Sequence, residues 1–264
     1  MLNQETENHS VSDKKYLVPF ILITSLFFLW GFARAILDVL NKHFQNALHI
    51  SITQSAMIQV TTYLGYFLMA IPAGIFINKY GYRRGVVFGL LLFGLGAIFF
   101  IPGASIGSFS AFLFCLFVIG CGLVFLETAA NPYVTELGAR ETATSRLNLS
   151  QSFNGLGSIF ATFCIGQFLF NDTQQGGNVV IPYAILGVLV LAIAVVFSRV
   201  DLPEIQHQQT TEDKAKGSNI AKLFANHRMF VFGLFALLSY EVAEISINSY
   251  FINFVTGMHW MSDR

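Results

Sequence analysis

The sequence predicts an all-α protein that crosses a membrane several times. Hydrophobic residues make up 54% of the 264 residues and charged residues only 11%, whereas soluble domains carry about 25% charged residues. A soluble chain of this length needs more charge on its surface to stay dispersed. Long uncharged stretches also recur, such as the one from Gly85 to Leu126. Together these observations indicate a polytopic membrane protein.

Seven apolar runs have the length of a membrane-spanning helix, which needs about 20 mostly apolar residues. Most connections between them are short and contain turn formers, for example PGASIGS at 102–108 and NDTQQGGN at 171–178. The predicted spans are Leu17–Leu40, Ile52–Asn78, Gly85–Ile101, Ser108–Leu137, Leu147–Phe170, Val179–Ser198 and Met229–Val255.

The basic residues predict the side of the membrane on which each connection lies. With the N-terminus in the cytoplasm, twelve of the 15 Lys and Arg residues fall in inner segments and two in outer segments. Basic connections favour the cytoplasmic side. The sequence therefore predicts a multi-pass protein of the inner membrane with a cytoplasmic N-terminus.

Polar segments divide the chain into four parts. Residues 1–16 form a cytoplasmic tail that lacks the basic start and cleavage site of a signal peptide. Residues 17–199 hold six spans, residues 200–227 form a polar cytoplasmic linker, and residues 228–264 hold a seventh span. This order matches the first part of a twelve-span plan. We expect a fragment whose natural partner is a missing C-terminal bundle, and a complete seven-span protein is the alternative.

The fourth span carries an acid on a polar helix face. Glu127 and Asn131 are four residues apart and share that face. Val124 and Gly120 extend it and are expected to leave room above the acid, while Pro132 weakens the helix beside it. Ionisable residues within spans usually mark a pathway or an internal pair. We interpret Glu127 and Asn131 as binding groups, and a structural carboxylate bonded to a neighbouring helix is the alternative.

The first span carries Asp38 four residues after Arg34. One interpretation is an ion pair that lets both residues enter the membrane, and the other is a carboxyl that gains and loses a proton. Inverted three-span repeats place the first and fourth spans in corresponding positions. Asp38 and Glu127 are then expected to face one cavity and to form a proton and solute site. Glu241 and Glu244, in the seventh span, have no assigned role.

Further substrate-binding candidates lie on other spans. Gln151 and Asn154 are three residues apart on the fifth span, and Gln59 and Tyr63 lie on the second. These side chains are expected to face the same cavity. Polar residues in spans often simply bond one helix to another, so that alternative stays open for each.

The connection GIFINKYGYRRG, residues 74–85, combines glycines with basic residues. Glycines allow close helix approach and a tight turn, and basic side chains anchor a loop at the anionic inner surface. A simple topogenic loop explains the charges but not the glycine spacing. The candidate residues of this conformational loop are Gly74, Asn78, Lys79, Gly81, Arg83 and Arg84.

This loop resembles the signature of the major facilitator superfamily, in which a Gly and a small apolar stretch precede an Asp, a basic residue, a Gly and two basic residues. Asn78 stands where the Asp is usual. Four ordered segments also resemble the fucose:proton symporter family over nearly the whole chain. They are FLWGFARAILDVLNKHFQ (28–45), YLGYFLMAIPAGI (63–75), FLETAANPYVTELG (125–138) and RLNLSQSFNGLGS (146–158).

The resemblance implies a major facilitator-type six-helix N-terminal bundle with a 3+3 inverted repeat, followed by the first helix of a truncated C-terminal bundle. It links Asp38 to proton coupling and Glu127 to sugar binding and coupling. It also places Asn131, Gln151 and Asn154 near the sugar.

We therefore expect a proton-coupled symporter for a fucose-, galactose- or glucose-type monosaccharide, with sugar, proton and lipid bilayer as partners. No cofactor, metal or nucleic acid is expected. A seven-span receptor or sensor without transport activity is the alternative, although the last span lacks the lysine that a retinal protein needs. An enzyme is disfavoured because all six histidines lie at span ends or in loops.

Overall fold

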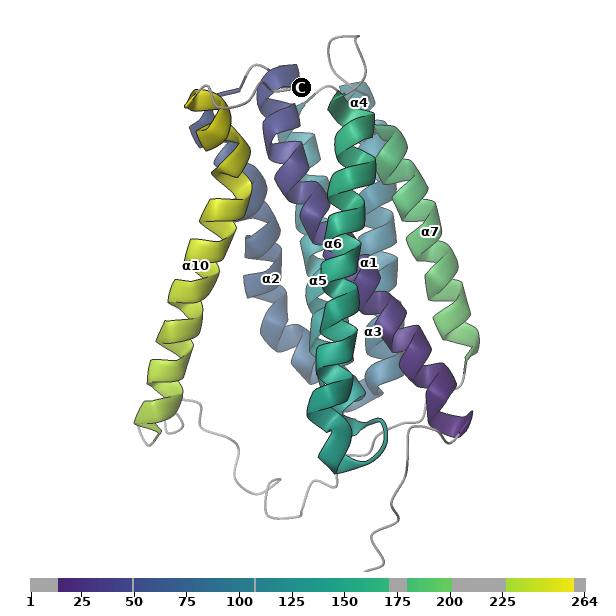
Figure 1. The fold of residues 1–264 in the computed structure, drawn as a ribbon. Helices are drawn as coiled ribbons and strands as arrows, with labels where there is room; N and C mark the ends of the chain where they lie inside the picture. Colours follow the sequence, from purple (N-terminus) through teal and green to yellow (C-terminus); the bar gives the residue numbers. More distant parts are fainter. Residues whose placement is uncertain (1–13, 49, 107, 171–179, 201–226, 259–264) are drawn as a thin grey trace, which may run out of the picture. The chain divides into compact units, whose positions relative to one another are not determined.

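The computed structural model describes the backbone of residues 14–48, 50–106, 108–170, 180–200 and 227–258, nearly all of which is helical (Figure 1). Within these ranges the chain contains no strand. The predicted linker at 200–227 and the predicted turn at 171–178 fall almost wholly outside the described residues. The chain divides into two compact units, residues 1–205 and residues 206–264.

All seven predicted spans lie on helices, which confirms the all-α fold class. The third predicted span covers two of them, α3 and α4. The helices of the first unit are α1 (Lys14–Leu48), α2 (Ile52–Tyr80), α3 (Tyr82–Ile98), α4 (Phe100–Ile106), α5 (Phe109–Glu136), the short 3₁₀ helix η1 (Arg140–Thr142), α6 (Ala143–Phe170) and α7 (Val180–Arg199), and the second unit holds α10 (Arg228–Gly257).

Five stretches of the described helices are long and apolar enough to cross a membrane. They are Tyr16–Ile36, Thr53–Tyr80, Tyr82–Gly103, Phe109–Glu136 and Arg228–Asn248. Among the described side chains of α7 the apolar stretch is Tyr183–Arg199, and the side chains of residues 165–170 of α6 and 180–182 of α7 lie outside the described residues.

The connection expected at 102–108 is wrong for most of its length. Residues Phe100–Ile106 form α4, which follows α3 after a break at Phe99. Gly and Pro suggested a turn, but Pro102 lies in the first turn of α4, where its missing N–H breaks no helical hydrogen bond. Among the described residues of this segment, only Ser108 lies outside a helix.

The connection between α2 and α3 is a single residue, Gly81. Its φ angle is 88°, a left-handed conformation that glycine adopts without steric cost. The Gly81 N–H donates to the carbonyl of Ile77 at 2.8 Å and closes the end of α2. A glycine is therefore needed here for the tight turn.

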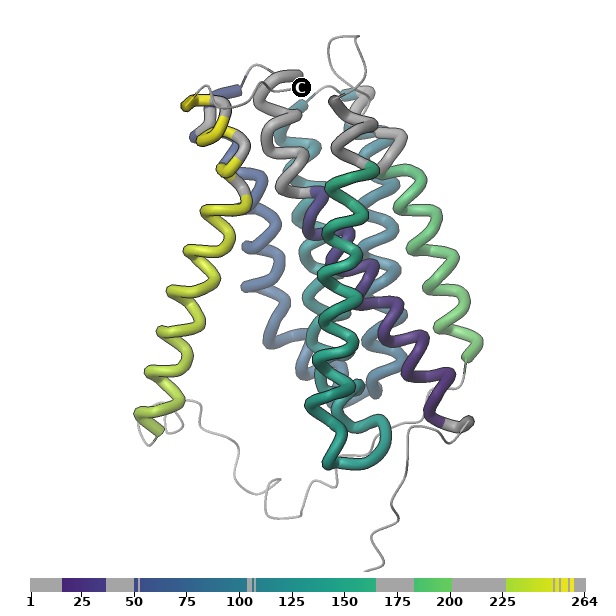
Figure 2. The backbone as a smooth tube through the Cα atoms, viewed as in Figure 1, coloured from purple at the N-terminus to yellow at the C-terminus, as the bar shows by residue number. Residues whose placement is uncertain are grey.

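Two packing partnerships organise the first unit. One joins α1 and α6 along their lengths, and the other places α5 against both α2 and α3, with α7 packed on the far side of α3. In Figure 2 the tube of α6 crosses in front of that of α1, and the two helices are in contact. Smaller contacts of α5 with α1 and α6 join the two partnerships.

The helices of each partnership approach at glycines. A Cβ atom built on Gly157 of α6 would overlap the backbone of Phe28 on α1, and one built on Gly31 would overlap the backbone of Asn154. Helices in lipid gain little from the hydrophobic effect, so close backbone contact contributes much of their association. The α1–α6 contact therefore depends on two residues without side chains.

The space expected above Glu127 is filled by a helix. A Cβ on Gly120 would overlap the backbone of Thr62 on α2, and Val124 is only 6% exposed. Gly120 thus brings α2 against α5 rather than opening a cavity. The sequence showed that a small residue lay there but could not show which helix would occupy the space.

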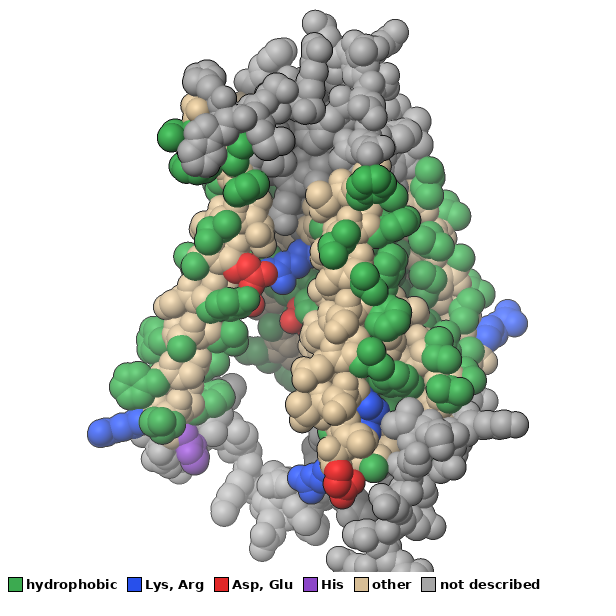
Figure 3. All heavy atoms as spheres, viewed as in Figure 1, with side chains coloured by type: hydrophobic (Ala, Val, Ile, Leu, Met, Phe, Trp, Pro, Cys, Tyr) green, Lys and Arg blue, Asp and Glu red, His purple; other side chains and the backbone are tan. Residues whose placement is uncertain are grey.

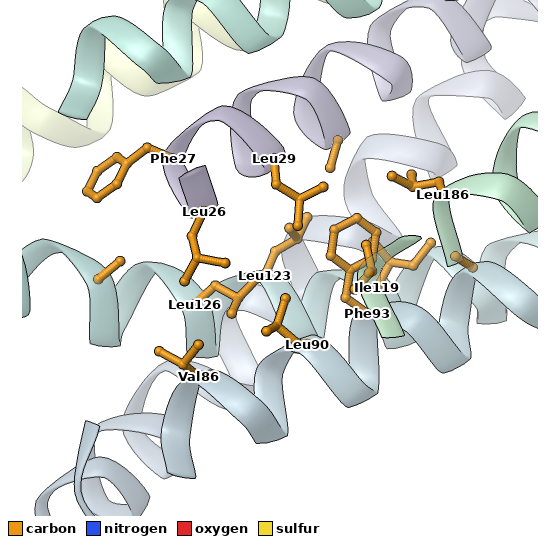
Figure 4. Packing of buried hydrophobic residues seen from close by; sticks show 14 of the residues in the cluster. Leu26, Phe27, Leu29, Val86, Leu90, Phe93, Ile119, Leu123, Leu126 and Leu186 are labelled. Atoms are coloured by element: carbon orange, nitrogen blue, oxygen red, sulfur yellow. The ribbon is translucent and has the colours of Figure 1, made fainter. Parts of the chain in front are cut away.

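The buried core lies between α1, α3, α5 and α7. Figure 4 shows Leu26 and Leu29 beside Leu90, Leu123 and neighbouring apolar side chains. Outward faces are also apolar, as is usual for a protein whose solvent is lipid. On the face shown in Figure 3, hydrophobic side chains run along α7.

The α1–α6 contact gives a stability prediction with a control on the same helix. Gly157→Ala should lower the free energy of unfolding by about 1–3 kcal/mol, because the added methyl must push α1 away. Gly155→Ala should be neutral or stabilising by up to about 1 kcal/mol, because no described atom lies within 4 Å of its Cβ position. Unfolding of the detergent-solubilised protein measures both. Equal effects of the two substitutions would contradict the close contact.

Candidate functional site

A hydrogen bond between two aromatic side chains joins α1 and α2 inside the first unit. The indole Nε1–H of Trp30 donates to the hydroxyl oxygen of Tyr66 at 3.2 Å. Both side chains are half-buried. Tyr and Trp combine an apolar body with a polar tip, and the tip usually has a partner when it is buried.

Two charged residues, one on α5 and one on α1, lie in the neighbourhood of Tyr66. Glu127 of α5 and Arg34 of α1 lie close enough to Tyr66 to act on it electrostatically, as does Tyr63 one turn earlier on α2. The rings of Tyr63 and Tyr66 have centroids 5.7 Å apart. We call Trp30, Arg34, Tyr63, Tyr66 and Glu127 the Tyr66 cluster. Its residues come from α1, α2 and α5, which also pack on one another.

A second polar contact joins α5 and α6. The side-chain amide of Gln151 donates to the Oδ1 atom of Asn131 at 3.3 Å. Asn131 lies one helical turn after Glu127, so this contact continues the polar face of α5 that Glu127 begins. Gln151 is exposed and Asn131 half-buried, which leaves polar surface on both for another molecule.

Asn154 lies at the α1–α6 contact. Its backbone faces Gly31, and the Ser158 hydroxyl donates to the carbonyl oxygens of Gly31 and Asn154 at 3.0 and 3.3 Å. The Asn154 side chain is half-buried. Asn154 is thus placed by α1 packing, one turn away from the Gln151–Asn131 contact.

Gln59 lies on the Tyr66 side of α2. Positions 59, 63 and 66 share one helix face by spacing, and the Gln59 side chain is half-buried. The structure thus associates this candidate with the Tyr66 cluster through its helix.

Three other acids of the predicted spans, Asp38, which was a predicted site residue, and Glu241 and Glu244, which had no assigned role, are not described as part of this site. The Asp38 side chain lies outside the described residues, although its backbone belongs to α1. Glu241 and Glu244 are half-buried residues of α10 in the second unit. The described site therefore contains Glu127 as its acid.

The conformational loop makes specific contacts at one end of the bundle. The guanidinium of Arg83 donates to the carbonyl oxygen of Phe197 at 3.3 Å and also to that of Ser198. These carbonyls end α7, where a helix lacks internal donors and favours a cation. Arg83 thus joins the first turn of α3 to the last turn of α7, a contact that a purely topogenic charge does not need.

The remaining loop residues are more exposed. Asn78, Lys79 and Arg84 are exposed, and the Lys79 ammonium lies 5.2 Å from the centroid of the Tyr80 ring. No described atom lies within 4 Å of the Cβ position of Gly74. Close helix approach, which the sequence suggested for the loop glycines, therefore does not occur at Gly74 within the described residues.

Arg146 has a structural role that sequence reasoning missed. It was counted only as a basic residue of an inner connection, but it is 4% exposed and donates to the carbonyls of Val134, Thr135 and Ala139 at 3.1, 2.7 and 2.8 Å. It also donates to the Thr142 hydroxyl at 2.6 Å. One guanidinium thus closes the end of α5 and shapes the turn into α6.

Sequence reasoning also missed Trp30 and Tyr66 as site residues. Both lie in segments that were singled out only as motifs. The signal for Tyr66 was its spacing from Gln59 and Tyr63, which puts three polar tips on one face of an apolar helix. Nothing in the sequence pairs Trp30 with Tyr66, because that contact depends on how α1 and α2 pack.

Among the described residues, no group of three His, Cys, Asp or Glu side chains is arranged to hold a metal ion. The polar groups of the site are hydrogen-bond donors and acceptors around one carboxyl. Such an arrangement suits a small polar solute or a proton.

The fold and the site together indicate the class of protein. Apolar helices that carry half-buried polar side chains on their inner faces make this a multi-pass helical membrane protein. The profile of the Major Facilitator Superfamily matches residues 23–262. The chain belongs to this superfamily.

Individual relatives cover most of the chain. It is 34% identical over 261 residues to a glucose/galactose transporter of Brucella abortus, a match covering 96% of this chain and 62% of the relative. It is 37% identical over 228 residues to an L-fucose-proton symporter of Haemophilus influenzae, covering 76% of this chain and 53% of the relative. The chain thus spans less than two thirds of the length of these relatives.

A crystal structure of the Escherichia coli fucose:proton symporter is similar in fold. The TM-score is 0.72 at 34% identity, and the match covers 91% of this chain and 63% of that protein. This similarity agrees with the resemblance that the sequence motifs indicated.

The buried position of Arg146 gives a prediction that separates its geometry from its charge. Arg146→Lys keeps the charge but loses the planar fork of donors, so it should lower the free energy of unfolding by about 1.5–3 kcal/mol. Arg140→Lys, at an exposed position of η1, should change it by less than about 0.5 kcal/mol. Unfolding measurements on the solubilised protein compare the two. If Arg146→Lys leaves the free energy of unfolding unchanged, the hydrogen bonds of Arg146 do not stabilise the protein and only its positive charge matters.

Proposed function

We propose that the chain forms the N-terminal part of a proton-coupled monosaccharide symporter that works by alternating access. Its superfamily and its relatives support this proposal, since those relatives include a glucose/galactose transporter and an L-fucose-proton symporter. A sugar of the fucose, galactose or glucose type is the proposed substrate. The membership in a transporter superfamily favours transport over the receptor alternative and over an enzyme.

The observation that carries the proposal is the position of the Tyr66 hydroxyl. Tyr66 lies on α2, which packs on both α1 and α5, and its hydroxyl accepts a hydrogen bond from Trp30 of α1, with Glu127 and Arg34 in its neighbourhood. Ionisable groups are costly within spans and favour a water-accessible path or internal partners. A group of donors, acceptors and aromatic rings is also suited to a ligand with many hydroxyls and an apolar ring face.

The residues have separate proposed roles. Glu127 binds sugar hydroxyls and takes part in coupling, and Asp38 carries the proton that moves inward with the sugar. The further substrate-binding residues are Asn131, Gln151, Asn154 and Gln59. The Gln151–Asn131 contact supports a shared role for α5 and α6, because it exposes amide groups of both helices on one side.

The proton supplies the driving force. Moving one charge down the membrane potential contributes about 2.3 kcal/mol per 100 mV, enough for considerable accumulation of a neutral sugar. Coupling requires that the outward and inward states differ in proton affinity, since a ligand shifts an equilibrium only by its differential affinity.

The loop residues Gly74, Asn78, Lys79, Gly81, Arg83 and Arg84 are proposed to take part in the change between states. The Arg83 contact with the end of α7 supports this role, because any movement of α7 relative to α3 must stretch or break it. Asn78 stands where the superfamily signature usually has an acid. Any contact that this position makes or breaks during the change between states would therefore involve an amide.

Alternating access needs two bundles that move about the site. We therefore propose that active transport requires a C-terminal bundle as the partner of this unit, and that residues 1–264 alone do not accumulate sugar. The inner membrane is the proposed location, with residues 1–16 and 200–227 in the cytoplasm.

Glu127→Gln tests the function directly. In vesicles that contain the protein with its complete reading frame, uptake of labelled L-fucose, D-galactose or D-glucose should increase with an inward proton gradient. Glu127→Gln should lower gradient-driven uptake at least about tenfold, because hydrogen bonds to an ionised acceptor contribute about 1.5–3 kcal/mol each. Glu141→Gln, at an exposed position of η1, should behave as the parent. Sugar uptake that does not increase with the proton gradient would contradict the symporter proposal. Unchanged gradient-driven uptake by the Glu127→Gln variant would contradict it as well.

The orientation is testable with two serines, one at the start of α5 and one at the start of α6. Ser110 lies in the first turn of α5 and Ser145 in the first turn of α6, and both are exposed. In a Cys164→Ser background, which leaves the two buried cysteines, Ser110→Cys should react with an impermeant maleimide in intact cells. Ser145→Cys should react only after permeabilisation. The reverse pattern would place the N-terminus outside.

A further inference from the structure

Aromatic rings from three helices pack together close to the turn between α2 and α3. The Phe76 ring of α2 stacks on the Phe88 ring of α3, with centroids 5.2 Å apart and planes at 23°. Tyr80, one helical turn after Phe76, has its ring centroid 4.7 Å from that of Phe76. Phe125 of α5 meets Phe76 and Phe88 edge-on and is only 2% exposed. We call these four rings the Phe76 cluster, which Phe125 attaches to the buried core.

The outer edge of the Phe76 cluster is exposed. Tyr80 is 41% exposed and Phe88 is 37% exposed. Exposed apolar side chains continue from Phe88 along α3 at Leu91 and Leu95, which share its helix face by spacing. Aromatic rings with an exposed edge suit the depth at which lipid head groups meet hydrocarbon chains. The cluster therefore offers an apolar surface to a molecule outside the chain.

Two exposed cations border this surface. The Lys79 ammonium lies 5.2 Å from the centroid of the Tyr80 ring, within the range of a cation–π contact. Arg84 is exposed and precedes Phe88 by one helical turn, so the two share a face of α3. Arg83 differs from both, because its guanidinium donates to the end of α7. The turn thus directs one basic side chain to the protein and leaves two exposed beside the Phe76 cluster.

The charges around this turn do not balance. Three basic residues and no acid lie between residues 51 and 126 of the sequence. Glu136, further along α5, lies in the neighbourhood of Tyr82 and Arg146, so it has a cation of its own. The turn between α2 and α3 therefore carries an excess of positive charge, which is complementary to an anion.

We propose that the Phe76 cluster, with Lys79 and Arg84, is a binding site for an anionic phospholipid. The head-group phosphate lies between the ammonium of Lys79 and the guanidinium of Arg84, and the acyl chains follow the exposed apolar side chains of α3 past Phe88. Basic side chains attract anionic head groups, and the apolar surface beside them favours a ligand with hydrocarbon chains over a soluble phosphate. This inference goes beyond the proposed transport function and does not depend on the side of the membrane that the turn faces.

Native mass spectrometry of the purified chain in detergent tests the site with phosphatidylglycerol as the probe. Phosphatidylglycerol should bind about thirtyfold more tightly than phosphatidylcholine, which has no net charge, because each of the two cations contributes about fivefold. Lys79→Gln combined with Arg84→Gln should remove this preference. Arg140→Gln combined with Arg228→Gln loses the same charge at exposed positions of η1 and α10, and it should change the preference less than about twofold.

A second measurement needs no substitution and so covers a failure of the charge variants to fold. A photoactivatable phosphatidylglycerol should cross-link the parent chain mainly within residues 76–95. Equal labelling of residues 136–146, or an equal loss of binding in the two double variants, would show a general attraction of basic residues and overturn the site. Displacement of the lipid by an equal concentration of glycerol phosphate would indicate a soluble anion as the occupant and overturn it as well. Failure of sugar uptake affects none of these readouts and counts against the proposed function alone.

Discussion

The first unit depends on backbone contact between helices at positions that carry no side chain. Gly157 and Gly31 bring α6 and α1 together, and Gly120 brings α5 against α2. Lipid removes most of the hydrophobic drive that joins helices in water, so the packing of such surfaces has to supply the association. A single methyl group at these positions meets backbone atoms, which cannot move aside as a flexible side chain can. The glycines therefore fix which helices are neighbours.

Which polar residues meet at the site follows from which helices are neighbours. Since α5 packs on α2 and also reaches α1 and α6, its polar face at Glu127 and Asn131 meets partners from three helices. Trp30 and Tyr66 join α1 to α2 beside Glu127, and Gln151 joins α6 to Asn131. Few of these groups are charged, and each has a neighbour that lowers the cost of placing it among apolar helices. The proposed binding groups are thereby held on helices while still keeping some exposed polar surface.

Two arginines tie the ends of helices into the same framework. Arg146 donates to the last carbonyls of α5, and Arg83 donates to the last carbonyls of α7. A helix end leaves several carbonyls without internal partners, and a cation suits the negative end of the helix dipole. Both arginines also belong to the basic residues that the sequence predicts on the inner side. One residue can thus serve topology and helix termination together, which explains why the charge bias alone did not reveal their contacts.

The sequence by itself determined the class of fold, the approximate bounds of its helices and the acid on α5. Membrane crossing requires long apolar runs, so the helices were visible in composition and length, and an acid such as Glu127 was conspicuous among them. The segment at 102–108 was misjudged, because a Pro in a first helical turn looks the same in sequence as a Pro in a connection. Only the tertiary structure decided that Gly120 admits α2, that Arg146 closes α5, and that Trp30 meets Tyr66. Each of these depends on which helix face meets which neighbour, and residues far apart in sequence carry no local signal of that contact.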